Sequence, residues 1–262
     1  MTVTLKSRHQ IAQLREAGRL VAETFEMLRE HVVPGVTTAE LDRITEEYIR
    51  SKGAQPIYKG YGAMHNNRGQ ITRPAFPATI CVAINDVICH GIPSPKQRLR
   101  DGDVVGIDIG VLLDGWVGDS CVTFAVGRLS SEAQRLVDVT QRCLELGIAE
   151  SLPGNHLGDI GAAIQTYAEA QGYSVVREWT GHGVGRSLHE PPTVPHIGKR
   201  GSGIKLQPGM VFTIEPMINM GKATTRLMPD QWTVRTGDGS LSAQFEHTIA
   251  ITDGPPEILT VL

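Results

Sequence analysis

Four carboxylate side chains lie in stretches of sequence that are otherwise apolar. They are Asp108, Asp119, Glu215 and Glu246. A buried carboxylate without a partner is so costly that it must become protonated, pair with a cation or bind a metal ion. A single acid of this kind is more often an edge charge or the partner of an arginine. Four such acids in a repeated pattern favour a metal site.

An imidazole accompanies these acids. His182 lies between Gly181 and Gly183 in a glycine-rich segment that is compatible with a tight turn. The glycine spacing fits neither a dinucleotide-binding fingerprint nor a P-loop. Four carboxylates and one imidazole can hold two divalent ions through bridging oxygens, and such oxygen-rich sets suit manganese, iron, cobalt or zinc. Paired ions of this kind activate water for hydrolysis.

Two further histidines could assist such a reaction. His90 and His189 could donate hydrogen bonds to a substrate carbonyl or to a tetrahedral intermediate. A lone histidine is more often a structural residue, but His90 matches His182 in a repeat and His189 follows it by seven residues. The remaining histidines are predicted to be structural: His9, His31, His65, His156, His196 and His247.

The first two acids are predicted to meet across a β-hairpin. Asp114-Gly115 is a strong two-residue turn signal between two β-rich runs. This turn places Gly110 opposite Asp119, so that Asp108 becomes a diagonal neighbour about 7–8 Å away on the same face. A slip of one residue would break this geometry.

The chain contains an internal repeat of helices followed by strands. Two helices are predicted in the first 50 residues and two more at 131–149 and 156–171. Strand-like runs lie within 78–127 and near 174–179, 210–218 and 243–252. Each half supplies a histidine and then two acids, which predicts one catalytic domain over residues 1–262 with similar α+β halves, about 1–127 and 128–262. The matched pairs are His90 with His182, Asp108 with Glu215, and Asp119 with Glu246.

The composition of the chain argues against several classes of protein. The 262 residues are 40% hydrophobic and carry a formal net charge of −3, which is ordinary for a globular protein and argues against nucleic-acid binding. No apolar run is long enough to span a membrane, and residues 1–10 lack the apolar core of a secretory signal. Four cysteines without CxxC spacing fit free thiols in a reducing cytoplasm.

Six segments together resemble the methionine aminopeptidases of the M24 metallopeptidase family, bacterial type I. The resemblance covers nearly the whole chain, and the set of motifs is highly specific. The segments are VICHGIP from Val87, GID from Gly106, VGD from Val117, GHGVGR from Gly181, FTIEPM from Phe212 and SAQFEHT from Ser242.

The resemblance implies an α+β pita-bread fold with pseudo-twofold symmetry and antiparallel strands around a central metal site. It implies two divalent ions bound by Asp108, Asp119, His182, Glu215 and Glu246, with Glu215 as the ligand that activates water. His90 and His189 would touch the scissile amide. Cys81, Trp232 and Phe76 would line an apolar methionine pocket.

The implied reaction removes the initiator methionine from nascent chains whose second residue is small, by means of metal-activated water. The implied partners are peptides with N-terminal methionine, nascent chains and the ribosome that carries them. The resemblance also implies a cytoplasmic monomer that binds neither membrane nor specific nucleic acid.

Two departures from the bacterial type I pattern concern the pocket. The 61–77 segment is longer than usual, and Leu188 stands where an aromatic residue is common. Residues 58–77 show no clear period and are predicted to form a long loop, and we hypothesise that it is a lid or rim over the pocket. The alternatives are an Xaa-Pro aminopeptidase or prolidase on the same fold, a non-enzymatic relative that binds proteins or RNA, and a globular α/β protein with structural acids.

Overall fold

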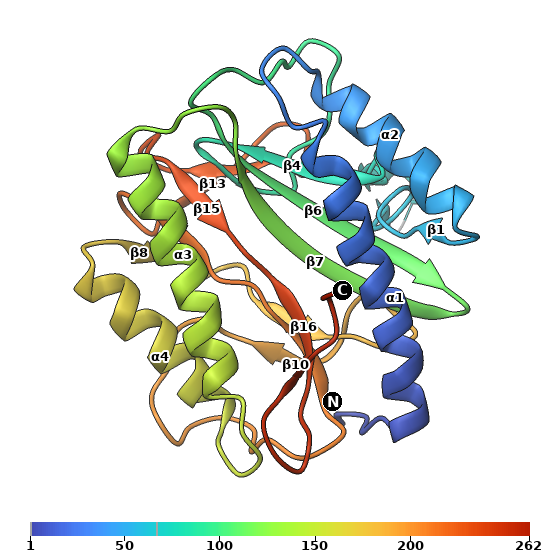
Figure 1. The fold of residues 1–262 in the computed structure, drawn as a ribbon, viewed down its shortest axis with the longest axis vertical. Helices are drawn as coiled ribbons and strands as arrows, with labels where there is room; N and C mark the ends of the chain where they lie inside the picture. Colours follow the sequence, from blue (N-terminus) through green and yellow to red (C-terminus); the bar gives the residue numbers. More distant parts are fainter. Residues whose placement is uncertain (1, 67) are drawn as a thin grey trace.

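Four helices lie on one side of the strands in the computed structural model, which describes residues 2–66 and 68–262 (Figure 1). They are α1 (Arg8–Arg29), α2 (Thr38–Ser51), α3 (Ser131–Ala149) and α4 (Leu157–Ala170). Helices α1 and α2 cover one part of the molecule, and α3 and α4 cover the other. Within the described residues, no helix combines the length and apolar character needed to cross a membrane.

Most strands pair within their own half of the chain, although one sheet joins strands of both halves. The first part of the chain contains β1 (Gln55–Pro56), β2 (Met64–His65), β3 (Ile71–Arg73), β4 (Ile80–Ile84), β5 (Val87–Cys89), β6 (Val104–Leu113) and β7 (Trp116–Ala125). The second contains β8 (Ser174–Val175), β9 (Gly181–Gly183), β10 (Glu190–Val194), β11 (Val211–Ile214), β12 (Met217–Asn219), β13 (Thr225–Leu227), β14 (Val234–Thr236), β15 (Ser242–Gln244), β16 (His247–Ala250) and β17 (Glu257–Ile258). The strand pairs are antiparallel, as the predicted α+β class requires.

Local sequence signals account for where the helices begin. Ser7 accepts a hydrogen bond from the backbone N–H of Gln10, and the Gln10 side chain accepts one from the Ser7 N–H, which together form the predicted capping box. At the start of α2 the Thr37 side chain accepts a hydrogen bond from the Glu40 backbone N–H, and at the start of α3 the Ser130 side chain accepts one from the Ala133 N–H. These caps satisfy backbone donors that would otherwise lack a partner.

The long hairpin of β6 and β7 has the predicted register. Asp114 and Gly115 form its turn with positive φ angles of 50° and 77°, which suits a two-residue hairpin. Gly110 pairs with Asp119, so Asp108 lies on the same face as Asp119. The hairpin therefore brings the first two acids to one side of the sheet.

The two halves of the molecule meet through β7 and the segment that carries β15 and β16. The Thr248 hydroxyl donates to the Asp119 carbonyl at 2.7 Å. The Glu246 backbone N–H donates to the Cys121 carbonyl at 2.8 Å. These bonds hold Asp119 and Glu246 next to each other although 127 positions separate them in the chain.

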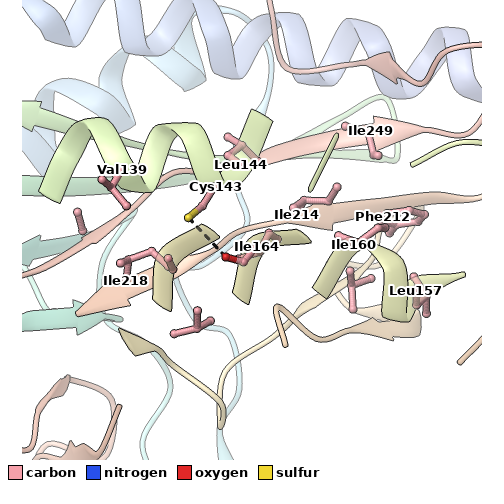
Figure 2. Close-up of a cluster of buried hydrophobic side chains, with 14 of the residues drawn as sticks. Val139, Cys143, Leu144, Leu157, Ile160, Ile164, Phe212, Ile214, Ile218 and Ile249 are labelled. Atoms are coloured by element: carbon pink, nitrogen blue, oxygen red, sulfur yellow. Dashed lines mark hydrogen bonds between the residues drawn. The ribbon is translucent and has the colours of Figure 1, made fainter. Parts of the chain in front are cut away.

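The core of the second half lies between its helices and strands. Figure 2 shows Leu144 and Ile164 of α3 and α4 packed with Ile214 of β11 and Ile249 of β16. The Cys143 thiol approaches the Ile164 carbonyl at 3.9 Å. All four cysteines of the chain lie among the described residues, and they are free and buried.

Two of the predicted strands are interrupted at their acids. The 210–218 run is divided between β11 and β12, because Pro216 follows Glu215 and has no N–H to donate to a ladder. The 243–252 run is divided between β15 and β16 at Glu246. Glu215 and Glu246 therefore lie in short irregular segments between strands. Asp108 and Asp119, in contrast, lie inside β6 and β7.

The predicted loop over residues 58–77 is wrong for part of the segment, which contains two short strands. Met64 pairs with Arg73 and His65 with Ile71, so β2 and β3 form a short hairpin. The strands have only two and three residues, and most of their side chains are exposed. Strands this short and exposed show no alternation of apolar and polar residues, so periodicity cannot detect them.

A close approach between α1 and β7 depends on glycine. A Cβ atom added to Gly118 would lie 2.4 Å from the carbonyl oxygen of Ala17 and 2.9 Å from the backbone nitrogen of Gly18. A Cβ at Gly106, in the neighbouring strand β6, would meet nothing nearer than the Ala83 Cβ at 3.4 Å. The helix backbone therefore contacts the sheet directly at Gly118.

Gly118→Ala is expected to lower the free energy of unfolding by about 1–3 kcal/mol, because α1 or β7 must move to admit the methyl group. Urea unfolding of the metal-free protein, followed by circular dichroism, measures this effect. Gly106→Ala is the matched control and should unfold close to the unsubstituted protein. Equal stability of the two variants would contradict the close approach.

Candidate metal centre

A cavity of about 260 Å³ contains all five of the predicted metal ligands. None of its lining residues belongs to a helix, so strands and loops alone form its wall. The ligands come from both halves of the molecule. They are Asp108, Asp119, His182, Glu215 and Glu246.

The five side chains form a connected group. Ligand atoms of Asp119, His182 and Glu246 all lie within 4.8 Å of one another. His182 Nε2 is 3.5 Å from Asp119 Oδ2 and 3.7 Å from Glu215 Oε1. Asp108 is joined to Asp119 through the Tyr58 hydroxyl, which lies at hydrogen-bond distance from both carboxylates.

The orientation of His182 suits a metal ligand. Its Nδ1 lies 3.1 Å from the Gly183 carbonyl and donates to it, which leaves the Nε2 lone pair facing the carboxylates. A metal-binding histidine commonly donates its other ring N–H in this way. Cβ atoms at Gly181 and Gly183 would collide with backbone carbonyl oxygens of neighbouring strands, so these glycines permit close strand packing.

Three polar side chains support Glu215. The Thr213 hydroxyl donates to Glu215 Oε1 at 2.8 Å and accepts from the His182 N–H at 3.0 Å. The Gln244 amide lies 3.4 Å from Glu215 Oε2. His196 Nε2 accepts a hydrogen bond from the Glu215 backbone N–H at 3.0 Å, so His196 is a structural residue placed directly against the site.

The carboxyl groups of the site have raised pKa values that a bound cation would offset. Burial raises the pKa of Asp119 to about 7, and burial together with the Asp119 charge raises the pKa of Asp108 well above its usual range. Burial also raises the pKa of Glu215 and Glu246 and lowers that of His182. The Tyr58 hydroxyl has one proton, so it can donate a hydrogen bond to either Asp108 or Asp119 but not to both at once. Carboxylate oxygens in this number, with one imidazole, fit a divalent metal ion.

The metal-free protein is expected to lose stability as the pH rises from about 7.5 to about 9. Burial raises the pKa of Asp108, Glu215 and Glu246 well above their usual range, so the folded protein binds protons that the unfolded chain does not, and it loses stability as rising pH removes them. Asp119, with a pKa of about 7 when folded, contributes its own loss at lower pH, mainly between about pH 4 and 7. The buried histidines have lowered pKa values, and unfolded histidines titrate near about pH 6.5, so from about pH 7.5 these side chains are neutral in both states. Thermal unfolding in a chelator, with and without added divalent ion, measures this.

The added ion should restore more stability at pH 9 than at pH 7.5. Glu246→Gln should flatten the pH dependence of the metal-free protein, since it removes one of the interacting charges. A metal-free protein whose stability rises over this range would contradict the placement of the carboxylates.

The two remaining catalytic candidates lie beside the acids in the same cavity. The His189 ring centroid is 4.1 Å from that of His182. His90 is held edge-on against Trp179 at 5.0 Å and against Trp232 at 6.3 Å. Burial lowers the pKa of both histidines to about 4, so each is neutral near pH 7 and retains one N–H to donate.

The predicted pocket residues lie together on the wall of the cavity. Cys81, Phe76 and Trp232 are buried, and the rings of Phe76 and Trp232 meet edge-to-face at 5.3 Å. Leu188 lies on the same wall. Tyr58, Phe76 and two further residues of the 58–77 segment, Tyr61 and Arg73, also line the cavity, so this segment forms part of its rim.

Sequence reasoning did not assign a role to Tyr58, Gln244, Thr213 or Trp179. Each is an ordinary polar or aromatic residue that reaches the site only through folding. Gln244 and Thr213 could have been suspected, because each lies two residues before an acid. Tyr58 and Trp179 carry no comparable local signal.

The site and the fold are those of a hydrolase that uses divalent metal. Residues 12–253 match metallopeptidase family M24, and the chain belongs to this family. Methionine aminopeptidase A of Synechocystis sp. is 49% identical over 99% of this chain and 98% of its own length. The methionine aminopeptidase of Rickettsia prowazekii has a structure that superposes with a TM-score of 0.93 at 44% identity, covering 99% of this chain and all of its own.

These findings confirm the resemblance and the pita-bread fold. A prolidase from Pyrococcus horikoshii has the same fold, with a TM-score of 0.74 and 21% identity, and the match covers 98% of this chain but 63% of the prolidase. At that identity the likeness extends to the fold alone.

Proposed function

We propose that this protein is a methionine aminopeptidase that releases the N-terminal methionine from peptides and nascent chains with a small second residue. The observation that carries the proposal is a group of four carboxylates, two of them buried, with His182 beside an apolar wall in one cavity of about 260 Å³. The acids suit a divalent metal ion, and the apolar wall suits a methionine side chain. Relatives that are nearly half identical over almost the whole chain carry the same name.

The proposed metal site holds two divalent ions, with manganese, iron, cobalt and zinc as the candidates. Its ligands are Asp108, Asp119, His182, Glu215 and Glu246. Bound there, divalent ions would supply a water of lowered pKa and polarise the scissile carbonyl. The negative floor of the cavity would also attract the free α-ammonium group of the substrate, which distinguishes an N-terminal residue from an internal one.

The protein groups have separate roles in this proposal. Glu215 accepts a proton from the attacking water and passes it to the leaving amine. His189 and His90 donate hydrogen bonds to the carbonyl oxygen as it gains negative charge. Cys81, Phe76 and Trp232 bind the methionine side chain.

We further propose that residues 1–262 act as one catalytic domain, since the cavity takes ligands from both halves. The proposed substrates are made on ribosomes, so we place the enzyme in the cytoplasm, where it would act near the ribosome. We also propose that it is a monomer.

The substrate rule can be tested with two peptides that differ only at the second position. The enzyme should release methionine from Met-Ala-Ser and leave Met-Phe-Ser intact, which mass spectrometry of the products would show. Equal cleavage of the two peptides would contradict a pocket that selects a small second residue. Failure to cleave either peptide under any metal condition would contradict the proposed activity itself.

A further inference from the structure

The rim of the cavity carries a hydrogen bond between a tyrosine and a proposed catalytic histidine. The Tyr61 hydroxyl lies 2.7 Å from His189 Nδ1, and the two rings lie against each other with centroids 5.5 Å apart and planes inclined by 33°. We propose that Tyr61 is a positioning residue, which donates to His189 Nδ1 and thereby keeps the imidazole proton on Nε2. This inference rests on the proposed function, in which His189 donates to the substrate carbonyl.

The chain holds the Tyr61 backbone in place. Its N–H donates to the Tyr58 carbonyl at 2.9 Å, and its carbonyl accepts from the Phe76 N–H at 2.9 Å. The Gly60 N–H donates to the Phe76 carbonyl at 2.8 Å. The two bonds to Phe76 close the base of the 61–75 segment, and the bond to Tyr58 fixes the turn before it, so Tyr61 has a defined position although the residue is 37% exposed.

A second set of contacts anchors the segment to Trp232. The Arg73 side chain donates to the Gly62 carbonyl at 2.9 Å, and its guanidinium lies 4.4 Å from the centroid of the Trp232 ring. The Trp232 indole N–H donates to the Pro74 carbonyl at 2.9 Å. Gly62 has a φ of +72°, and a Cβ there would lie 2.6 Å from the Trp232 ring. Gly62 before the β2–β3 hairpin and Arg73 and Pro74 at its end therefore all pack closely against Trp232, which forms part of the pocket wall.

Proton counting explains the effect of the Tyr61 hydroxyl. A neutral imidazole has one N–H, and a tyrosine hydroxyl has one proton to donate. When the hydroxyl donates to Nδ1, the imidazole proton is on Nε2, which is then the nitrogen that can donate to a substrate. Without this bond the imidazole can exchange between both tautomers and rotate about its side-chain torsions. A partner on the second ring nitrogen is the usual means of fixing the tautomer of a functional histidine.

Tyr61→Phe is the direct test, since it keeps the ring and removes only the hydroxyl. With Met-Ala-Ser as substrate and saturating metal, kcat should fall by roughly three- to tenfold, as expected for the loss of one hydrogen bond that aligns a catalytic group. KM and the bound metal content should stay unchanged. Tyr167→Phe, on helix α4 and away from the cavity, is the matched control and should leave kcat unchanged.

A double-mutant cycle distinguishes positioning from a general effect on the rim. In a His189→Ala background, Tyr61→Phe should have no further effect on kcat, since the residue through which it acts is absent. An equal fold-loss in both backgrounds would overturn the proposal, because Tyr61 would then act through another group. An unchanged kcat in the single variant would also overturn it.

A second readout does not depend on activity. In protein labelled with ¹⁵N-histidine, the His189 resonances, identified by their absence in His189→Ala, should show a protonated Nε2 and an unprotonated Nδ1. Tyr61→Phe should shift the Nδ1 resonance. A protonated Nδ1 in the unsubstituted protein would overturn the inference even if the enzyme cleaves methionine. If the proposed function itself is wrong, the unsubstituted protein will not cleave Met-Ala-Ser, and this result does not depend on which nitrogen of His189 carries the proton.

Discussion

Glu246→Gln is expected to abolish metal binding and peptide hydrolysis together. Glu246 is 2% exposed and shares a ligand cluster with Asp119 and His182. The substitution keeps the size of the side chain but removes the charge and one ligand oxygen. Replacing a group that merely supports a metal ligand commonly costs about 10–100-fold in metal affinity, so loss of a ligand should cost at least about 100-fold.

The metal-free Glu246→Gln protein should be at least as stable as the metal-free parent, because the substitution removes one buried charge from a group of four neighbouring carboxylates. Isothermal titration with manganese or cobalt measures the affinity, and thermal unfolding in a chelator measures the stability. Glu257→Gln, which removes an acid paired with Arg15 away from the cavity, is the matched control and should retain both metal and activity. A Glu246→Gln protein that binds metal with parental affinity would contradict the ligand assignment.

His189→Ala is expected to lower kcat by about 10²–10³-fold while the metal remains bound. The reason is the loss of a hydrogen-bond donor to the carbonyl oxygen in the transition state, and the size of the effect is that of removing one such donor. His189 is a neighbour of the proposed ligand His182 but is not part of the group of possible ligand atoms formed by Asp119, His182 and Glu246. Steady-state kinetics on Met-Ala-Ser, with the metal content of the same samples, measures both quantities.

The exposed His31 provides the control, since His31→Ala removes an imidazole away from the cavity and should leave kcat unchanged. Loss of the metal from His189→Ala would show that this histidine is a ligand instead of a donor. A kcat within about twofold of the parent value would show that it has no part in the reaction.

The parts of the fold that could be predicted are those that local rules determine. The Asp114-Gly115 turn predicted the register of β6 and β7 to the residue, because a two-residue turn leaves one way to pair the strands. Ser7 with Gln10 predicted the start of α1 through their reciprocal hydrogen bonds. The repeat of one histidine and two acids also predicted which side chains would share a cavity.

Other features depend on contacts between distant segments and could not be predicted. The position of Tyr58 between Asp108 and Asp119 is set by the path of the chain after β1. His196 meets the backbone of Glu215 from a different loop, so nothing near it in the sequence indicates the contact. The β2–β3 hairpin is too short and too exposed to leave a periodic pattern.

The central claim is that the buried carboxylates hold metal for methionine release, and metal add-back tests it most directly. The enzyme is stripped with a chelator and assayed on Met-Ala-Ser and Ala-Pro-Ser, with manganese, iron, cobalt or zinc restored in turn. We expect no activity without metal, and metal-dependent release of methionine from Met-Ala-Ser alone. Cleavage of Ala-Pro-Ser instead, or release of methionine that persists in the stripped enzyme, would contradict the claim.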